Sequence, residues 1–425
     1  MTATSNLTGK KVNRFTHLHQ STDDLIKKVK MQRLLGQKTA ACFQRCVGMD
    51  AANAVYSATY ETDQACGTTY HENCGKFWTQ VQENDWGVDG AMTDVKGDRG
   101  LSPSKQADPD LFLHVVERTP EGVYVTGAKA HQTGYLNSHY VLVMPTISMR
   151  EGDEDYAISF ACPTDAEGIT LILGRQSCDT RKTEEHNDID VGNKVYGGHE
   201  VLVIFDRVFI PNDMIFLNGE VEFAGMIVER FAGYHRQSYG GCKVGVGDVL
   251  IGATQLAVEM AGCQKASHVK DKIIEMIHLN ETLYACGIAC SSQGSKTKSG
   301  NYLIDLLLAN VCKQNVTRFP YEIARLAQDL AGGLMVTQPS EADYRNPATH
   351  DYIEKYLKGV ASVPTEDRMR VLRLIENMTM GTAAVGYLPE SMHGAGSPQA
   401  QRIMISRQGN LAMKKQLAKA IARID

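Results

Sequence analysis

The sequence predicts an α+β chain in which a helical part, a β-rich part and a second, larger helical part follow one another. Three observations predict this order. Apolar residues recur at helical spacing near the N-terminus, short β-branched runs follow between residues 112 and 205, and long apolar stretches at helical spacing occupy the rest. We expect domain boundaries that give the ranges 1–108, 109–215 and 216–425.

The first helix is predicted to begin at Ser21, because a hydroxyl at the cap is followed three residues later by the carboxylate of Asp24. An apolar stripe at helical spacing then continues as far as Phe43. We therefore expect Cys42 and Cys46, four residues apart, to project from one face of this helix. A second helix is expected over 51–64, followed by a polar segment over 71–90.

The middle part contains short β-branched runs bounded by Gly, Pro, Asn and Asp, at residues 112–117, 122–126, 140–144, 156–160, 169–173 and 201–205. Strands at such short spacing, with no helical pattern between them, predict an antiparallel sheet packed as a barrel or a sandwich.

The C-terminal part contains long Ala-, Leu-, Ile- and Met-rich stretches broken at Gly or Pro, at residues 246–262, 265–292, 302–334, 365–381 and 399–421. This pattern predicts a helical bundle. The segment 338–364 is expected to be an irregular connection.

Composition excludes several classes of function. The chain has 425 residues, of which 43% are hydrophobic and 22% charged, and its formal net charge of -5 gives no basic surface for nucleic acid. The N-terminus lacks the apolar core of a signal peptide and no apolar run reaches membrane-spanning length, so we expect a cytoplasmic protein with no membrane partner. Eleven cysteines in such a chain indicate reduced thiols or metal ligands rather than disulfides.

Four residues are candidates for a metal site: Cys42 and Cys46 near the N-terminus, and His235 and Cys242 in the C-terminal part. Three thiolates and one imidazole form a soft donor set that suits an iron–sulfur cluster or zinc. On a straight helix His235 and Cys242 would lie roughly 10 Å apart along the axis. We expect the glycine pair at 240–241 to bend the chain and bring both to one metal centre.

The other thiols are expected to be structural. Cys286 and Cys290 repeat the spacing of four within an apolar stretch, where a thiol behaves as a small hydrophobic group. The remaining cysteines show no paired ligand spacing: Cys66, Cys74, Cys162, Cys178, Cys263 and Cys312. A lone histidine such as His235 is more often a core residue, but Tyr239 and Lys243 place further polar groups beside it, and these are costly to bury without function or partners.

Two glycine-bearing stretches, 94–100 and 127–134, offer backbone N–H groups and cations to a nucleotide phosphate. No GxGxxG motif follows a predicted strand, so a Rossmann domain is not expected. Two carboxylates, Glu200 and Glu390, are candidates for acid–base chemistry.

Four motifs together carry a family resemblance: Cys42-x3-Cys46, the segment 229–243 around His235 and Cys242, the segment 129–134, and the segment 390–396. They resemble the 4-hydroxybutyryl-CoA dehydratases, a branch of the flavoprotein family shared with the 4-hydroxyphenylacetate 3-monooxygenases, over essentially the whole chain. The resemblance implies an acyl-CoA dehydrogenase-like fold with N-terminal helices, a middle antiparallel β-barrel and a C-terminal helical bundle. It also implies a homotetramer, a dimer of dimers, with flavin sites at subunit contacts.

The resemblance implies two cofactors. A [4Fe-4S] cluster would be held by Cys42, Cys46, His235 and Cys242. FAD would contact the stretches 92–99 and 131–133 and one helix end, through Met92, Thr93, Lys96, Gly97, Asp98, Arg99, His131, Gln132, Thr133, Asp329 and Gly333.

The implied reaction is a radical dehydration of 4-hydroxybutyryl-CoA to crotonyl-CoA, accompanied by vinylacetyl-CoA delta-isomerase activity. Loss of the α-proton and transfer of one electron to FAD would acidify the β-proton, and hydroxide would then leave from C4 at the cluster. The resemblance assigns His235 as ligand and base, Glu200 and Tyr239 as groups for protons or the leaving hydroxyl, Lys243 as a charge beside the cofactors, Thr133 as a hydrogen-bond partner of the flavin, and Glu390 as a proton relay.

The chain departs from the family pattern in two places. The chain begins later than family members usually do, without an N-terminal helical segment, and the connection over 346–364 is shorter. Three alternatives stay open. A reduced-flavin-dependent aromatic monooxygenase has no need of the thiols, a flavin-free binding protein would use them for structural zinc, and an isomerase without dehydration would keep only proton transfer.

Overall fold

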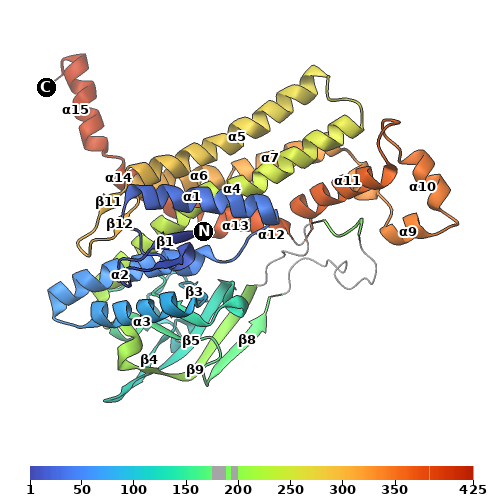
Figure 1. The fold of residues 1–425 in the computed structure, drawn as a ribbon. Coiled ribbons are helices and arrows are strands. Elements are labelled where there is room, and N and C mark those ends of the chain that lie inside the picture. Colours follow the sequence, from blue (N-terminus) through green and yellow to red (C-terminus); the bar gives the residue numbers. More distant parts are fainter. Residues whose placement is uncertain (175–187, 193–199, 382, 425) are drawn as a thin grey trace.

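The computed structural model describes residues 1–174, 188–192, 200–381 and 383–424. Cys178, expected to be structural, lies outside these ranges. Long helices form one layer of the molecule, and the β-rich part lies beneath them, with further helices beside the sheets (Figure 1).

The N-terminal part consists of the antiparallel strands β1 (Thr2–Thr4) and β2 (Lys11–Asn13) and the helices α1 (Thr22–Thr39), α2 (Cys46–Cys66) and α3 (Tyr70–Asn84). The predicted start of α1 is confirmed, because Ser21 caps it by accepting a hydrogen bond from the backbone N–H of Asp24 at 3.1 Å.

One expectation for this part was wrong. Helix α1 ends before Cys42, because Ala40 adopts the left-handed conformation with φ 50° and its N–H closes the last turn on Gly36. Cys42 therefore lies in the link between α1 and α2, and Cys46 is the first residue of α2. The polar segment 71–90 belongs mostly to α3 and to the start of a strand.

The described residues of the middle part form two four-stranded sheets. The first has the order β10 (Ile215–Asn218), β7 (Ile158–Pro163), β6 (Tyr140–Val143) and β3 (Val88–Ala91). The second has the order β4 (His114–Arg118), β5 (Gly122–Thr133), β9 (Glu200–Pro211) and β8 (Ile169–Leu173). One apolar cluster packs side chains from both sheets, including the rings of Phe160 and Phe205, whose centroids lie 6.1 Å apart.

The prediction of an acyl-CoA dehydrogenase-like middle β-barrel was wrong in its sheet topology. In the described residues the strands form two sheets with separate edges, and no closed barrel joins them. Strand β3 also runs parallel to β6, so the first sheet is mixed. The physical reason is that β3 comes from the N-terminal part, directly after α3, and is not joined to β6 by a hairpin. It adds to the edge of the sheet at β6, where all four of its residues are buried.

The C-terminal part is helical, with one small hairpin of β11 (Ser295–Lys296) and β12 (Tyr302–Leu303). Its helices are α4 (Val221–Met260), α5 (Ser267–Ser292), α6 (Leu306–Val316), α7 (Phe319–Ala331), α8 (Leu334–Thr337), α9 (Glu341–Arg345), α10 (His350–Tyr356), α11 (Thr365–Thr379), α12 (Ala384–Tyr387), α13 (Pro389–His393), α14 (Pro398–Gln408) and α15 (Leu411–Ala422). Helices α9 and α10 lie in the segment expected to be an irregular connection.

Helix α4 is the central element of this part. It is long and apolar enough to cross a membrane by length and composition alone, but 67% of its most apolar stretch is buried in the fold. Its apolar side chains therefore pack in the core of the fold. The helix runs through Gly240 and Gly241 without ending.

The glycines of α4 instead allow backbones to approach closely. A Cβ at Gly245 would lie 2.1 Å from the carbonyl oxygen of Arg33 in α1, and one at Gly240 would lie 2.7 Å from the Cα of Gly287 in α5. No side chain fits in these positions, so the three helices pack at backbone distance.

This packing predicts opposite effects of alanine at two glycines of α4. Gly245→Ala should lower the free energy of unfolding by about 1–3 kcal/mol, because the new methyl group meets backbone that cannot move cheaply. Gly252→Ala is the matched control: a Cβ there meets nothing within 4 Å, so the higher helix propensity of alanine should raise stability by about 1 kcal/mol. Thermal unfolding of both variants checks this, and shifts in the same direction would contradict it.

Candidate functional site

Three predicted thiols come from two regions of the fold. Cys42 lies in the α1–α2 link, Cys46 at the start of α2 and Cys242 within α4, and the last two are buried. Burial raises the pKa of Cys46, and negative charge on Asp50, Cys242 and Cys42 raises it further. Burial likewise raises the pKa of Cys42, with a contribution from Cys242. The structure therefore brings the three sulfur atoms into one electrostatic neighbourhood.

His235 lies two turns before Cys242 in α4, so both side chains occupy the same face of that helix. Its Nδ1 lies 2.8 Å from Oδ2 of Asp50. One ligand atom each from Cys46, Asp50 and His235 lie within 4.8 Å of one another. The imidazole is thus brought next to the Cys46 thiol.

Two aromatic rings of α4 hold the imidazole plane of His235. Phe231 stacks on it with centroids 5.6 Å apart and planes 9° apart, and Tyr239 meets it edge-on at 5.2 Å. These contacts, one turn before and one turn after His235, restrict rotation of the ring.

Asp50 and Lys28 are site residues that the sequence pattern did not reveal. The Nζ of Lys28 lies 2.5 Å from Oδ1 of Asp50, and both side chains are fully buried. Burial opposes ionisation of Asp50, but Lys28 and His235 outweigh it and lower the pKa of Asp50. One signal was present in the sequence, since Asp50 follows Cys46 by four residues and so shares its helix face.

Lys243 and Glu390 form a second buried ion pair, at 2.7 Å, between α4 and α13. Lys243 also donates a hydrogen bond to the carbonyl oxygen of Gly386. Burial lowers the pKa of Lys243, but the charges of Glu390, Cys242 and Cys42 outweigh it and raise the pKa above its usual value. The ammonium therefore stays charged.

The ring of Tyr239 lies between two lysines. The Nζ of Lys243 is 4.9 Å and that of Lys313 is 4.6 Å from the ring centroid. Lys313, which no sequence motif indicated, donates a hydrogen bond of 2.5 Å to the carbonyl oxygen of Ser391. Burial lowers the pKa of Lys313 to about 7, with contributions from the charges of Lys243 and Arg236.

Glu200 connects the second sheet to this site. It pairs with Thr133 in the register of β5 and β9, and the Thr133 hydroxyl donates a hydrogen bond to its carboxylate. Burial and then the charge of Glu390 raise the pKa of Glu200 to about 7. Asp89 on β3 is buried nearby, and among the described residues neither of its oxygens has a hydrogen-bond partner. Burial raises its pKa to about 7 as well.

The two stretches expected to contact FAD in the β-rich part lie side by side. Ala130 donates its N–H to the carbonyl oxygen of Thr93 at 2.8 Å, and a buried ion pair of 2.9 Å joins Lys129 to Asp94. The structure places Met92, Thr93, Lys96, Gly97, Asp98 and Arg99 in the loop after β3 and His131, Gln132 and Thr133 at the end of β5. Positive φ angles at Lys96, Gly97 and His131 shape this surface.

The third predicted FAD element is not brought to these stretches. Asp329 lies in α7, Gly333 follows the end of that helix, and Asp329 forms an ion pair of 2.5 Å with Lys272 of α5. In the described part of the chain, α7 packs chiefly on α4 and α5.

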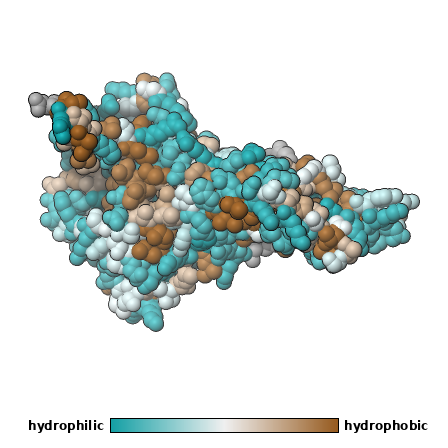
Figure 2. Space-filling model, turned by 90° about the horizontal axis from the view of Figure 1, so that it is seen from above, coloured by the Kyte–Doolittle hydropathy of each residue, from teal (hydrophilic) through white to brown (hydrophobic). Residues whose placement is uncertain are grey.

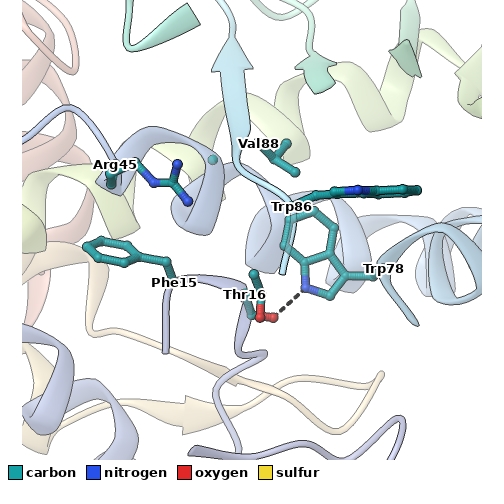
Figure 3. A pocket seen from close by; sticks show the side chains of 7 residues that line it. Phe15, Thr16, Arg45, Trp78, Trp86 and Val88 are labelled. Carbon is teal, nitrogen blue, oxygen red and sulfur yellow. Dashed lines mark hydrogen bonds between the residues drawn. The ribbon is translucent and has the colours of Figure 1, made fainter. Parts of the chain in front are cut away.

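A small pocket lies beside the start of α2 (Figure 3). Its volume of about 10 Å³ is on the scale of one water molecule, so it is too small for a nucleotide or a thioester. Its lining residues are Phe15, Thr16, Arg45, Gly48, Trp78, Trp86 and Val88, and Trp78 donates its indole N–H to the carbonyl oxygen of Thr16 at 2.6 Å. It therefore does not replace the thiol region as the candidate site.

Comparison with known families matches the chain in two parts. Residues 1–217 match the 4-hydroxyphenylacetate 3-hydroxylase N-terminal family, and residues 224–423 match the corresponding C-terminal family.

The oxygenase component (HpaB) of 4-hydroxyphenylacetate 3-monooxygenase, solved in complex with FAD, has a TM-score of 0.85 at 22% identity and covers 99% of this chain and 86% of its own. A glutaryl-CoA dehydrogenase reaches a TM-score of only 0.58, at 12% identity. The expected acyl-CoA dehydrogenase-like fold class is therefore corrected to the HpaB-like fold.

Two more similar proteins narrow the assignment. The 4-hydroxybutyryl-CoA dehydratase/vinylacetyl-CoA-Delta-isomerase of Clostridium aminobutyricum is 68% identical over 100% of this chain and 88% of its own length. The oxygen-tolerant archaeal 4-hydroxybutyryl-CoA dehydratase from N. maritimus has a TM-score of 0.98 at 60% identity, covering 100% of this chain and 84% of its own. The chain belongs to the 4-hydroxyphenylacetate 3-hydroxylase family and, within it, to the 4-hydroxybutyryl-CoA dehydratases.

Proposed function

We propose that this protein dehydrates 4-hydroxybutyryl-CoA to crotonyl-CoA and isomerises vinylacetyl-CoA to the same product. The observation that carries the proposal is the 68% identity, over the whole chain, to the enzyme of Clostridium aminobutyricum that has both names. The monooxygenase relative with solved structure is 22% identical and supports the fold alone. The substrate class is therefore a CoA thioester rather than a phenol.

We further propose that Cys42, Cys46, Cys242 and His235 hold a [4Fe-4S] cluster. Three soft thiols and one imidazole are a donor set that iron–sulfur clusters use. The donors meet only in the folded chain, because they come from the α1–α2 link and from α4. The ionised Asp50 has hydrogen-bond partners on both oxygens, so it is not a free fifth ligand.

FAD is the second proposed cofactor. The paired stretches after β3 and at the end of β5 offer backbone groups, the Thr133 hydroxyl and the cations Lys96 and Arg99 to a flavin and its phosphates. Because Asp329 and Gly333 lie elsewhere in the subunit, we assign them to the FAD of a neighbouring copy. When bound, FAD supplies reversible one-electron transfer, and the cluster supplies an iron that polarises the leaving hydroxyl.

Different side chains around the proposed cluster site would take up or release the protons of the reaction. The Nδ1 of His235 faces Asp50, so Nε2 is the ring nitrogen left for both proposed roles, and it would take a proton from substrate carbon only while it is not bound to iron. Glu200, with a pKa of about 7, can hold or release a proton at neutral pH. Tyr239 is the further hydroxyl near the thiols, and it hydrogen-bonds the hydroxyl that leaves.

Charge in the site is set by Lys243 and Glu390. Lys243 keeps a positive charge beside the thiols, which stabilises negative charge that develops on the substrate. Glu390, held by Lys243 at 2.7 Å, relays protons to and from the substrate. Thr133 donates to Glu200 and so couples the flavin side of the site to that carboxylate.

We also propose a cytoplasmic homotetramer, a dimer of dimers. What supports assembly is the C-terminal helix α15, which projects from the body (Figure 1) and carries exposed apolar side chains (Figure 2). These side chains are Leu411, Met413, Leu417 and Ile421. Apolar surface of this kind is typical of contact between copies.

The test of the function is anaerobic purification, analysis of iron, sulfide and flavin, and an assay on 4-hydroxybutyryl-CoA. We expect about four irons and about one FAD per chain, with crotonyl-CoA as the product. FAD without iron, together with no dehydration, would contradict the proposal and favour the monooxygenase alternative. Zinc without FAD would favour a binding protein.

Replacing one cluster thiol should remove iron selectively. Cys242→Ala should lower bound iron and reduce dehydratase turnover by more than about 100-fold, because the cluster loses a covalent ligand. Cys286→Ala is the matched control, since Cys286 belongs to the other cysteine pair at a spacing of four and lies in α5. Iron analysis and turnover measure both. Equal iron in the two variants would exclude Cys242 as a ligand.

Glu200 should make stability depend on pH. Its pKa is about 7 in the folded chain, against 4.5 for an unperturbed glutamate, so ionising it costs the folded state free energy. The cost is absent below about pH 4.5, grows up to about pH 7 and is complete above it. Glu200→Gln removes this cost.

Relative to the wild type, the melting temperature of the Glu200→Gln variant should rise by roughly 2–4 °C between pH 5 and pH 8. Glu167→Gln, at an exposed position, is the control and should show no such trend. A pH-independent difference for Glu200→Gln would show that Glu200 ionises normally.

Charges on α15 should disrupt assembly. Leu417→Glu combined with Ile421→Glu places two carboxylates on exposed apolar positions of this helix, which opposes burial between subunits. Light scattering should show a smaller particle than the wild type. Lys414→Glu, on the same helix, is the control for added negative charge. An unchanged tetramer in the double variant would exclude α15 from the interface.

A further inference from the structure

The imidazole of His235 is held by a buried network that the proposed reaction does not itself use. Asp50 presents Oδ2 to His235 Nδ1 at 2.8 Å and to the Ser238 hydroxyl at 2.9 Å, and Oδ1 to Lys28 at 2.5 Å. Asp50 and Lys28 are both fully buried. A buried charge pair of this kind is costly unless it is fully hydrogen-bonded.

Lys28 completes the network from α1. Its ammonium group has three N–H donors, and three acceptors are present: Asp50, the Tyr234 carbonyl oxygen at 3.0 Å and Gln237 Oε1 at 2.9 Å. No donor is left for a substrate or a cofactor. Lys28 therefore serves as the fixed counter-charge of Asp50.

An ionised carboxylate can only accept hydrogen bonds, so the proton between Asp50 and His235 lies on Nδ1 of the imidazole. The tautomer with a proton on Nδ1 leaves a lone pair on Nε2. The rings of Phe231 and Tyr239 fix the plane in which that lone pair lies. Geometry thus determines which nitrogen of His235 is available.

We propose that Asp50, held by Lys28, is a positioning residue that keeps His235 in the Nδ1–H tautomer and directs Nε2 to the cluster. The inference rests on the proposed function, because it concerns His235 as a ligand. Asp50 is therefore not itself a cluster ligand, although its carboxylate lies within 4.8 Å of the ligand atoms of Cys46 and His235. Carboxylates that accept from the second nitrogen of a ligating imidazole commonly have this effect.

The test replaces both members of the pair, so that no buried charge is left alone. The variant carries Lys28→Met and Asp50→Asn, and it is purified anaerobically with the wild type. Hyperfine spectroscopy of the reduced cluster in protein labelled with 15N-histidine reports the bond to the imidazole. Iron content and turnover are measured on the same samples.

We expect the double variant to keep its iron through the thiols, to show a changed 15N coupling, and to lose turnover by about 10–100-fold. Unchanged coupling and turnover would overturn the inference. Loss of iron as complete as in Cys242→Ala would also overturn it, since Asp50 would then be a ligand. If the double variant does not fold, Asp50→Glu takes its place, with the same expected changes in coupling and turnover.

Asp248→Asn is the matched control. Asp248 pairs with Arg33 at 2.8 Å and so forms another ion pair between α4 and α1, but the pair is partly exposed and lies away from His235. Turnover and 15N coupling should stay within about twofold of the wild type. A wild-type protein without iron would contradict the proposed function itself, whereas an iron-containing wild type with an unaffected double variant contradicts the positioning role alone.

Discussion

The backbone-distance packing of α4 against α1 and α5 is the constraint on which the site depends. Glycines on α4 meet α1 and α5, and Gly36 of α1 meets the carbonyl oxygen of Cys242, where a Cβ would lie 2.6 Å away. Because the α1 and α4 backbones touch, a buried lysine of α1 can reach the carbonyl oxygen of Tyr234. The close approach of these two helices also brings the link after α1, which contains Cys42, to the middle of α4, which contains Cys242. A wider spacing of these helices would separate Cys42 from Cys242, so the proposed ligand set depends on helix packing.

Buried charges in the site fall into two kinds. Lys28 and Lys243 each face a carboxylate at hydrogen-bond distance, so each pair holds its two side chains in place. Glu200 and Lys313 are less well matched, and burial moves the pKa of each to about 7. Matched pairs fix geometry, and groups that titrate near neutral pH can exchange protons. The site therefore contains fixed charges next to groups suited to proton transfer, which is what a reaction with two proton removals requires.

The sequence predicts most helices and strands of this fold because their apolar periodicity is strong. The sequence does not predict features that depend on contacts between distant parts of the chain. Helical spacing continues past Thr39, but Ala40 turns left-handed and places Cys42 in a link. Strand β3 is four residues long and pairs in parallel with a strand some fifty residues later, and no local pattern shows such a pairing. Cys42, Cys46, His235 and Cys242 were predicted from their donor types and from a family resemblance, whereas the contact of Lys28 with Asp50 follows from the packing of α1 and α2 against α4.

The chemistry of the site, more than its fold, separates the competing functions. The fold is shared at a TM-score of 0.85 with an FAD-containing monooxygenase component, so the scaffold by itself allows either reaction. Three thiols and an imidazole would suit structural zinc as well as a cluster. A structural site, however, needs no acid–base groups around it, and here Glu200, Tyr239 and Glu390 act electrostatically on one another or on the thiols. Burying such groups costs free energy that metal binding alone does not require. Their presence favours a centre at which protons move, which is the requirement of a dehydratase.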